Sequence, residues 1–313
     1  MWFFWKIKTS FWLIVETIKS IKKFPILLLP IFITWVVFAI ITIYLQYYAV
    51  FPDNDILFYL TFFWIFWFIT FVLTYTSSIM VNIVKQIETD WIIKIKDAFK
   101  ESNKKIFKLW GLSLIWAVIW FLLVILEVIL AKAKDNKSSW SVNYEWVAKT
   151  LWWEWSIFSW FGLWLQVIKD LLRLSVFLSV PNIMWKNKWV ISSIKEWWKI
   201  IWKHPVEFLW MYGSMVLIWI LMALPLWIIF SLSDNWHQFS NLFWILVIIY
   251  EWIIWTFSIY MEQMASTLLV LWHMKWEKEN LWVEKWQEKP ISEIEKPSLL
   301  DDVREFSNNS SSQ

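Results

Sequence analysis

Four charged side chains fall within apolar stretches of this chain, and their types and positions could do chemistry. Lys169, Asp170 and Arg173 lie within one apolar run, and Glu251 lies within another. Charged groups at membrane depth are rare, and they usually face a bundle interior, a substrate path or an ion path. Asp170 and Arg173 are three residues apart, so they can pair on one helix face. We therefore treat these four residues as a candidate intramembrane polar site.

Two interpretations of this site stay open. In the first, the side chains form a path for a polar substrate or ion. In the second, Asp170 and Arg173 form a buried ion pair that fixes packing, or their segment lies partly in the membrane interface. Arg173 is one of two arginines in the chain, which favours a fixed, bidentate charge there. We expect Glu127 and Glu262, also within apolar runs, to reach the lipid headgroups.

The sequence shows no catalytic or metal-binding motif. His204, His237 and His273 are scattered among loops and span ends, and we interpret them as interfacial residues rather than ligands. No H-E-x-x-H, G-x-S-x-G or Walker-type pattern occurs. The chain has no cysteine, which excludes disulfides, a catalytic thiol and cysteine-based metal sites. We therefore predict a protein that is not an enzyme and that holds no cofactor and no metal.

The composition is typical of an integral membrane protein. Of the 313 residues, 59% are hydrophobic, and the mean hydropathy is +0.51. Several apolar runs exceed the roughly 18 residues that a membrane-spanning helix needs. The net charge is only +3, and we predict no nucleic-acid partner. The first apolar run is about membrane length with no A-x-A-like site after it, so we expect no cleavable signal peptide.

We predict an all-α, polytopic helix bundle in residues 1–274 and a polar, disordered cytoplasmic tail in residues 275–313. The bundle would contain about six membrane spans, over residues 24–47, 56–80, 109–131, 156–180, 206–230 and 242–271. The fourth span is the least certain prediction, because it contains Lys169, Asp170 and Arg173 of the candidate polar site. Whether it crosses the bilayer completely stays open at this point.

The connecting segments alternate in charge. Lysines are frequent in residues 1–23, 83–108, 182–205 and the tail, whereas residues 48–55 and 232–240 contain neither Lys nor Arg. By the positive-inside rule, both termini lie in the cytoplasm, and we expect the protein in a bacterial inner membrane. The segment 132–151, with four lysines on the predicted outer side, is an exception.

A short amphipathic segment of one design precedes the first, third and fifth predicted spans. The acids Glu16, Asp97 and Glu196 align, and lysines follow three and seven residues later, at Lys19, Lys23, Lys100, Lys104, Lys199 and Lys203. These spacings share one helix face. We therefore predict three basic helices on the cytoplasmic membrane surface, with lysines facing anionic lipid headgroups. The pattern predicts a threefold repeat of one surface helix and two spans, with chance similarity of lysine-rich loops as the alternative.

Two stretches of the chain resemble a group of uncharacterised bacterial six-span membrane proteins. The first, Ser10 to Ile31, contains S-F-x-L-I and K-K-F-P-I-L-L-L-P-I. The second, Val180 to Pro205, reads V-P-N-I-M-x-K-N-K-x-V-I-S-S-I-K-E-x-W-K-I-I-x-K-H-P. The group is similar in layout to the membrane domain found beside glycerophosphodiester phosphodiesterases. The resemblance does not extend to the phosphodiesterase domain, and it implies a fold without a known activity.

Tryptophan and glycine occur in unusual proportions, with 33 Trp and 3 Gly, whereas average chains contain about 7% Gly. Trp276, Trp282 and Trp286 lie in a Lys/Glu-rich segment where an indole has nothing to pack on. Trp185 and Trp189 flank a Lys-Asn-Lys turn, where glycine is usual. We interpret most of these Trp as glycines in the cell, from UGA codons that a bacterium reads as Gly. A truly Trp-rich protein with interfacial aromatic belts is the alternative.

The function that we expect is non-enzymatic. The chain would be an integral membrane protein that interacts with membrane lipids or organises the cytoplasmic membrane. The alternative is a transporter or permease-like protein that uses the charged fourth span. An intramembrane enzyme of lipid metabolism would need a clustered acid–base or metal set, which this sequence does not show.

Overall fold

The computed structural model describes residues 2–47, 55–90, 93–135, 160–232, 241–280, 291 and 294, and the regular structure within these ranges is helical. The predicted all-α class is therefore confirmed for this part of the chain. The helices are α1 (Trp2–Lys23), η1 (Pro25–Leu28), α2 (Leu29–Tyr47), α3 (Asp55–Asp90), α4 (Ile95–Lys104), α5 (Ile106–Asp135), α7 (Trp160–Trp185), α8 (Val190–Lys203), α9 (Pro205–Leu232) and α10 (Asn241–Glu279).

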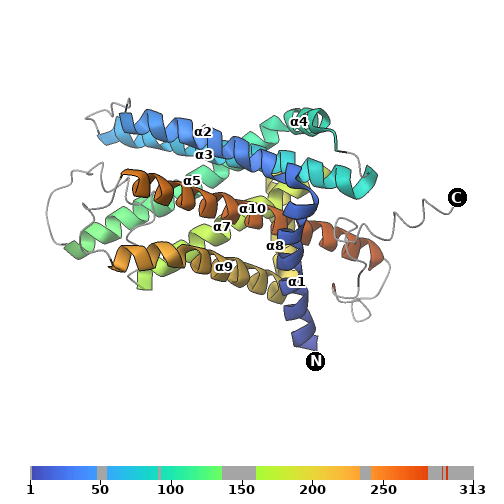
Figure 1. The fold of residues 1–313 in the computed structure, drawn as a ribbon. Helices are drawn as coiled ribbons and strands as arrows, with labels where there is room; N and C mark the ends of the chain where they lie inside the picture. Colours follow the sequence, from blue (N-terminus) through green and yellow to red (C-terminus); the bar gives the residue numbers. More distant parts are fainter. Residues whose placement is uncertain are drawn as a thin grey trace.

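The six helices α2, α3, α5, α7, α9 and α10 lie side by side, and the other three described α-helices, α1, α4 and α8, lie towards one end of them (Figure 1). We call these three the short helices, although α1 has 22 residues and α2 has 19. α3 packs against α5, and α7 packs against α3, α5 and α10. α1 lies across α9 and α10, α4 packs on α3, and α8 packs on α7. We call the end that carries α1, α4 and α8 the short-helix end.

Each short helix ends just before a long one, with the four-residue η1 between α1 and α2. α1, α4 and α8 end at Lys23, Lys104 and Lys203, and each has a lysine in its last turn, where a positive charge complements the helix dipole. Pro25 and Pro205 then begin the next helix, where their missing N–H costs no hydrogen bond. These are the three positions at which the sequence predicted surface helices. A threefold repeat of the whole unit stays a prediction.

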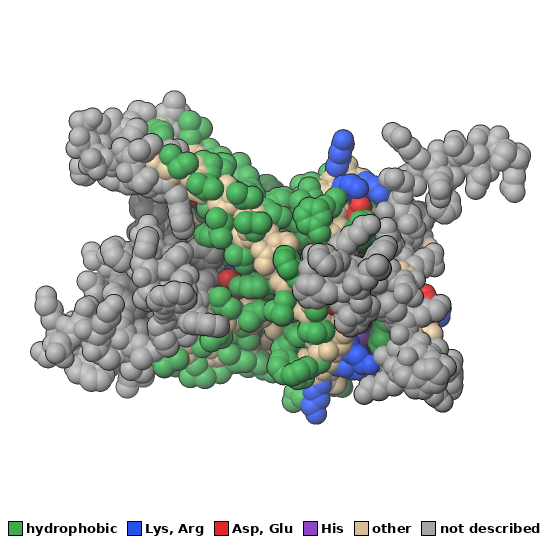
Figure 2. Space-filling view, turned by 90° about the horizontal axis from the view of Figure 1, so that it is seen from below, with side chains coloured by type: hydrophobic (Ala, Val, Ile, Leu, Met, Phe, Trp, Pro, Cys, Tyr) green, Lys and Arg blue, Asp and Glu red, His purple; other side chains and the backbone are tan. Residues whose placement is uncertain are grey.

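Four helices in the described part of the chain contain segments long and apolar enough to cross a membrane, namely Pro25–Leu45, Leu57–Thr89, Ile106–Leu126 and Pro205–Leu226. Only 22–33% of their most apolar windows is buried inside the bundle. A water-soluble protein rarely exposes such a large apolar area. Figure 2 shows hydrophobic side chains over much of the described surface, with Lys and Arg towards one end. The chain is therefore compatible with an integral membrane protein.

The four segments correspond to the first, second, third and fifth predicted spans. The fourth and sixth predicted spans lie in α7 and α10, which carry charged residues within their apolar sequence. A total of six spans stays a prediction.

The hydrophobic core is densest towards the short-helix end. Its best-buried residues come from Ile79–Ile87 of α3, Leu174–Met184 of α7 and Ile259–Trp272 of α10. Leu13 and Ile14 of α1 close this core from the side. α10 continues past the predicted boundary at residue 275, and Lys275 pairs with Glu88 of α3 at 3.0 Å. Most of the predicted tail lies outside the described residues.

Candidate functional site

Two residues of the predicted polar site, Asp170 and Arg173 of α7, lie in a cluster of ion pairs with Glu262 of α10. Arg173 of α7 donates from Nε to Oε2 of Glu262 at 2.5 Å and from Nη2 to Oε1 at 2.6 Å. The same Nη2 donates to Oδ1 of Asp170 at 3.1 Å. The three side chains are only 9–17% exposed. This is a bidentate guanidinium–carboxylate pair with a second carboxylate beside it, the strongest form of side-chain ion pair.

The expectation that Glu262 reaches the lipid headgroups was wrong. Glu262 is 7% exposed and is the main partner of Arg173. The sequence places Asp170 three residues from Arg173, and this local pair is present, but it could not show that α10 packs on α7. Glu127 lies in α5, and its side chain is outside the described residues.

The structure does not bring the four predicted site residues to one point. Lys169 is buried at 4% exposure, beside Asp170 in the chain. Glu251 is half-buried on α10, and it precedes Glu262 by eleven residues. This separation corresponds to roughly 16 Å along a helix. Glu251 therefore lies on the same helix as the partner of Arg173, but well away from the guanidinium.

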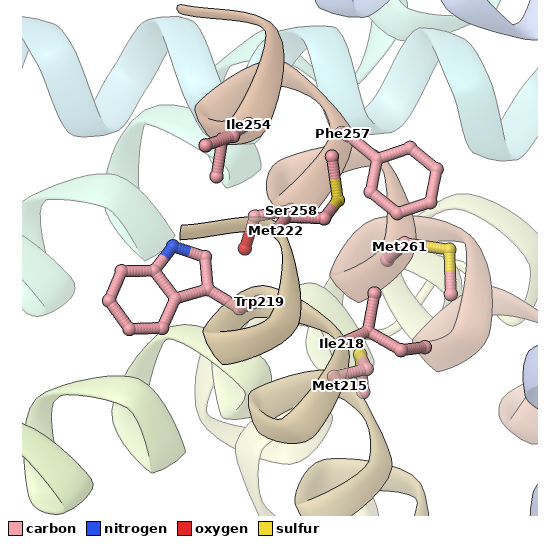
Figure 3. Close-up of a pocket in the computed structure, with 8 residues that line it drawn as sticks. All are labelled: Met215, Ile218, Trp219, Met222, Ile254, Phe257, Ser258 and Met261. Carbon is pink, nitrogen blue, oxygen red and sulfur yellow. The ribbon is translucent and has the colours of Figure 1, made fainter. Parts of the chain in front are cut away.

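We call Asp170, Arg173 and Glu262 the arginine cluster. Two neutral hydroxyl groups lie beside it. Tyr212 of α9 lies 3.5 Å from Oδ2 of Asp170, and Ser258 of α10 lies 3.4 Å from Oε1 of Glu262. Both distances are long for O–H···O bonds. Ser258 also lines a small, partly open hollow of about 10 Å³ between α9 and α10, which is room for about one water molecule. Figure 3 shows its other lining side chains, Met215, Ile218, Trp219, Met222, Ile254, Phe257 and Met261.

A second charged cluster lies at the short-helix end, where α8, α10 and the α7–α8 connection meet. We call it the lysine–glutamate network. Lys186 contacts Glu196 at 3.0 Å and Glu277 at 2.7 Å. Lys188 contacts Glu196 at 2.6 Å. Lys199 contacts Glu277 at 3.1 Å. The network ties the three elements together at the point where α10 leaves the bundle.

The ion pairs of this network shift its pKa values. Burial alone would raise the pKa of Glu277, but hydrogen bonds from Lys186 and Lys199 outweigh it and lower that pKa to about 2. Burial also opposes ionisation of Glu196, and its two lysine partners likewise lower its pKa. The carboxylates in turn raise the pKa of Lys186 above its usual value, against the effect of burial. All of these groups are charged at neutral pH.

Two histidines meet beside the network. Nε2 of His204 and Nδ1 of His273 are 3.0 Å apart, and the residues are 4% and 0% exposed. Trp276 stacks on His273 with ring centroids 5.5 Å apart. Burial lowers the pKa of His273 to about 4, so its imidazole is neutral at pH 7. Nε2 of His273 is buried and has no hydrogen-bond partner among the described residues.

This pairing corrects two expectations. We had interpreted the histidines as scattered interfacial residues, but His204 and His273 meet because α9 begins where α10 ends. We had also expected Trp276 to lack packing partners, whereas it is 7% exposed and packs on both imidazoles. No sequence spacing links positions 204 and 273, so only the tertiary structure reveals the pair. His237 lies outside the described residues.

Glu196, His273 and Glu277 place possible metal-ligand atoms within 4.8 Å of one another. Both oxygens of each carboxylate, however, already accept from a lysine ammonium group. Three lysines against two carboxylates give a net positive charge, which repels a divalent cation. We therefore assign this cluster as an ion-pair network rather than as a metal site.

The lysines that we predicted to face lipid lie at or beside the short-helix end, but several have protein partners. Lys19 pairs with Glu16 at 2.8 Å, and Lys104 pairs with Glu101 at 2.5 Å. Lys199 belongs to the lysine–glutamate network. The Nζ atom of Lys203 lies 5.1 Å from the ring centroid of Trp276. Lys100 is exposed and Lys23 is half-exposed.

Apolar side chains are exposed beside these lysines. Phe11 and Ile18 of α1 are 62% and 41% exposed, Ile191 of α8 is 67% exposed, and Phe107 at the start of α5 is 86% exposed. A mixture of exposed apolar side chains and lysines is typical of a surface that contacts the interfacial layer of a membrane. No protein-family model matches the chain, and no curated protein matches it either.

Proposed function

We propose that this protein is a multi-pass, non-enzymatic membrane protein of a bacterial inner membrane that binds anionic lipid headgroups at its short-helix end. The observation that carries this proposal is the arrangement of α1, α4 and α8. Each of the three short helices carries lysines and leads directly into a long apolar helix. Lysines near an anionic surface contribute about 1 kcal/mol each to binding.

The exposed apolar side chains support the same orientation. Phe11, Ile18 and Ile191 lie on short helices, next to the apolar windows of the long ones. Inserted at the headgroup layer, these side chains would gain hydrophobic stabilisation while the neighbouring lysines stay in the polar region.

Six spans are the topology that we propose. In α7 and α10 the membrane-depth charges of Arg173 and Glu262 neutralise one another, which removes the main objection to burying these two helices in a bilayer. The resemblance to bacterial six-span proteins supports this topology, and it implies no activity.

Cysteine labelling tests the topology, since the chain has no native cysteine to interfere. We expect Lys96→Cys and Ser192→Cys, at exposed positions of α4 and α8, to react with an impermeant thiol reagent only after the cells are opened. Asn54→Cys and Asn235→Cys, on the predicted outer loops, should react in intact cells. The reverse pattern would contradict the proposed orientation.

Lipid binding is tested by comparing phosphatidylglycerol with phosphatidylcholine retained by the purified protein in native mass spectrometry. The triple variant Lys19→Gln, Lys23→Gln, Lys203→Gln should lose about 3 kcal/mol of preference for the anionic lipid, on the order of 100-fold. A matched control removes three lysines from the segment that the sequence predicts on the outer side, Lys132→Gln, Lys134→Gln and Lys137→Gln. Equal losses in the two variants would contradict a lipid site at the short-helix end.

A transporter or permease is the second candidate, favoured by the charged cluster of Asp170, Arg173 and Glu262 beside the hollow at Ser258. Asp170→Asn should then abolish uptake of a solute without changing membrane insertion. Asp97→Asn, at an exposed position on α4, is the control. Normal growth and uptake with Asp170→Asn would identify the cluster as a structural ion pair.

A further inference from the structure

Two isoleucines of the predicted C-terminal tail are buried in the core of the bundle. Ile291 is 1% exposed and Ile294 is 3% exposed, and both belong to the same continuous core as Leu13 and Ile14 of α1. Ordering a tail costs conformational entropy, which burial of its apolar side chains has to offset. The burial of both isoleucines therefore indicates that the bundle has a binding site for this part of the tail.

A turn presents the two isoleucines together. The N–H of Ile294 donates to the carbonyl oxygen of Ile291 at 3.3 Å, which is the hydrogen bond that closes a β-turn. Such a turn brings the Cα atoms of its first and last residues within about 7 Å of each other. The motif that the site accepts is therefore Ile-x-x-Ile, with both apolar side chains available to one patch of the bundle.

The site lies where α10 meets α1. Nε1 of Trp272 on α10 donates to the carbonyl oxygen of Ile294 at 3.4 Å. The Trp272 ring also packs edge-on against Trp12 of α1, with ring centroids 5.8 Å apart. The tail thus docks beside one of the three short helices. Because we interpret most Trp positions as glycine in the cell, the burial of the isoleucines, rather than the indole hydrogen bond, carries this assignment.

The tail can reach this site within one molecule. Asn280 follows the end of α10 and lies eight residues beyond Trp272, which is roughly 12 Å along a helix. Ten residues separate Asn280 from Ile291, and an extended chain covers about 3.3–3.6 Å per residue. This connection is about three times as long as the distance that it has to span. The occupant of the site is therefore the chain's own tail rather than the tail of a second copy.

The docked segment is acidic, whereas the short-helix end is rich in lysines. Residues 291–302 contain four acidic side chains and one lysine, and two of the acids directly adjoin Ile294 in the chain. Nζ of Lys203 lies 5.1 Å from the ring centroid of Trp276, one helical turn further along α10 than Trp272. Docking of the tail therefore brings negative charge to the end of the bundle that we assign to anionic lipid.

We propose that the short-helix end holds a docking site for the tail motif Ile291-x-x-Ile294, and that the docked, acidic tail competes with anionic lipid for the lysines there. Bound lipid repels the tail carboxylates, and release of the tail leaves the lysines to the lipid. Each ligand lowers the affinity of the other by the same factor. The competition rests on the proposed function because it needs the lipid site, whereas the docking itself does not.

Cysteine labelling of the full-length protein in detergent micelles tests the docking. Ile294→Cys should react with a polar maleimide about 100-fold more slowly than Ser192→Cys, at an exposed position of α8. Adding Ile291→Asn should release the tail and raise the rate of Ile294→Cys to that of Ser192→Cys. Ile291→Val, which keeps an apolar side chain, is the matched control and should preserve the protection.

Two results of the labelling would overturn the docking. Equal rates for Ile294→Cys and Ser192→Cys would show that the site does not hold the tail. Protection of Ile294→Cys that disappears on dilution would assign the site to the tail of a second copy, and it would overturn docking within one chain.

Native mass spectrometry tests the competition. The double variant Ile291→Asn, Ile294→Asn should bind phosphatidylglycerol about tenfold more tightly than the parent protein, the equivalent of one to two lysine contacts. Its binding of phosphatidylcholine should not change, and the conservative variant Ile291→Val, Ile294→Val should match the parent. Reciprocally, phosphatidylglycerol but not phosphatidylcholine should speed the labelling of Ile294→Cys.

The two lipid measurements separate this proposal from the proposed function. If the triple lysine variant loses its preference for phosphatidylglycerol but the double asparagine variant gains none, the lipid site stands and the competition is overturned. A parent protein without any preference for phosphatidylglycerol overturns the lipid site and the competition together. In that case the labelling rate of Ile294→Cys still decides the docking.

Discussion

The arginine cluster and the lysine–glutamate network solve the same problem differently in two environments. α10 supplies one carboxylate to each, Glu262 to the first and Glu277 to the second. The first matches one arginine with two carboxylates, and its side chains are at most 17% exposed. The second matches three lysines with two carboxylates, and its side chains are up to 50% exposed.

The difference follows from hydration. In a dry interior, a planar guanidinium can satisfy two carboxylates in fixed geometry, and it loses less hydration than an ammonium group does. At a hydrated end, lysines can exchange partners, and each carboxylate keeps a second cation when one leaves. The arginine cluster should therefore be rigid and intolerant of change, whereas the network should be adaptable. Four substitutions, taken from the largest expected effect to the smallest, test this contrast.

Glu262→Gln should have the largest effect on stability. It leaves Arg173 with only the more distant Asp170, inside an apolar bundle. Removing one partner of a buried ion pair costs about 3–5 kcal/mol. Replacing both partners, in the double variant Arg173→Met, Glu262→Leu, should recover most of this loss because no buried charge is left. Denaturant unfolding in detergent micelles measures both. A double variant as unstable as Glu262→Gln would show that packing, not the unpaired charge, determines the cost.

His273 should make stability depend on pH at the network end. Burial lowers its folded-state pKa to about 4, from about 6.5 in the unfolded chain. Above about pH 6.5 both states are neutral there, and the full stability is present. As the pH falls towards 4, the unfolded chain binds the proton first, so stability declines by an amount on the order of 3 kcal/mol.

The pH dependence of unfolding between pH 7 and 4 measures this decline. His273→Phe should flatten the curve in this window, while His237→Phe should leave it as in the parent protein. Glu277 contributes little to this decline. Its folded-state pKa is lowered to about 2, so the stability that its charge provides is lost only as the pH falls below about 4.5. An unaltered curve with His273→Phe would place the titrating group elsewhere.

The contrast between the clusters also marks what the sequence could predict. The breaks before α5 and α9 follow from local chemistry, since Pro205 and the aligned Lys104 and Lys203 mark them in the chain. The pair of Asp170 and Arg173 was equally local, three residues apart. Each of these features depends on neighbours within two helical turns, which a sequence shows directly.

The features that the sequence did not reveal are contacts between distant helices. Arg173 and Glu262 are 89 residues apart, and His204 and His273 are 69 residues apart. Nothing in the spacing indicates that α10 packs on α7 or ends beside the start of α9.

The tryptophans raise a separate question about composition. The indole N–H groups of Trp67, Trp116 and Trp185 are buried without an acceptor among the described residues. A buried tryptophan usually finds a partner for this group. That most of the Trp positions are glycine in the cell stays a prediction. An intact mass well below 38.4 kDa for protein from its native host would support it, and a mass equal to this value would exclude it.

Glu277→Gln should cost less than Glu262→Gln, about 1 kcal/mol, because Lys186 keeps Glu196 and Lys199 can turn to solvent. The remaining charges are partly hydrated, so the cost should shrink further in high salt. Denaturant unfolding at low and high ionic strength measures both. A cost close to that of Glu262→Gln, with no dependence on salt, would show that the network is as dry as the arginine cluster and would remove the contrast.

Glu101→Gln should have the smallest effect on the free energy of unfolding. Glu101 and Lys104 pair at 2.5 Å on α4, but their side chains are 49% and 57% exposed. Exposed pairs one helical turn apart contribute no more than about 0.5 kcal/mol. The pair is thus as short as the contact between Arg173 and Glu262, and it differs chiefly in hydration. If Glu101→Gln matched Glu277→Gln in the same unfolding assay, exposure would not be the variable that ranks these ion pairs. A graded series from Glu101 through Glu277 to Glu262 would instead establish that loss of water, rather than contact distance, sets the value of each charge.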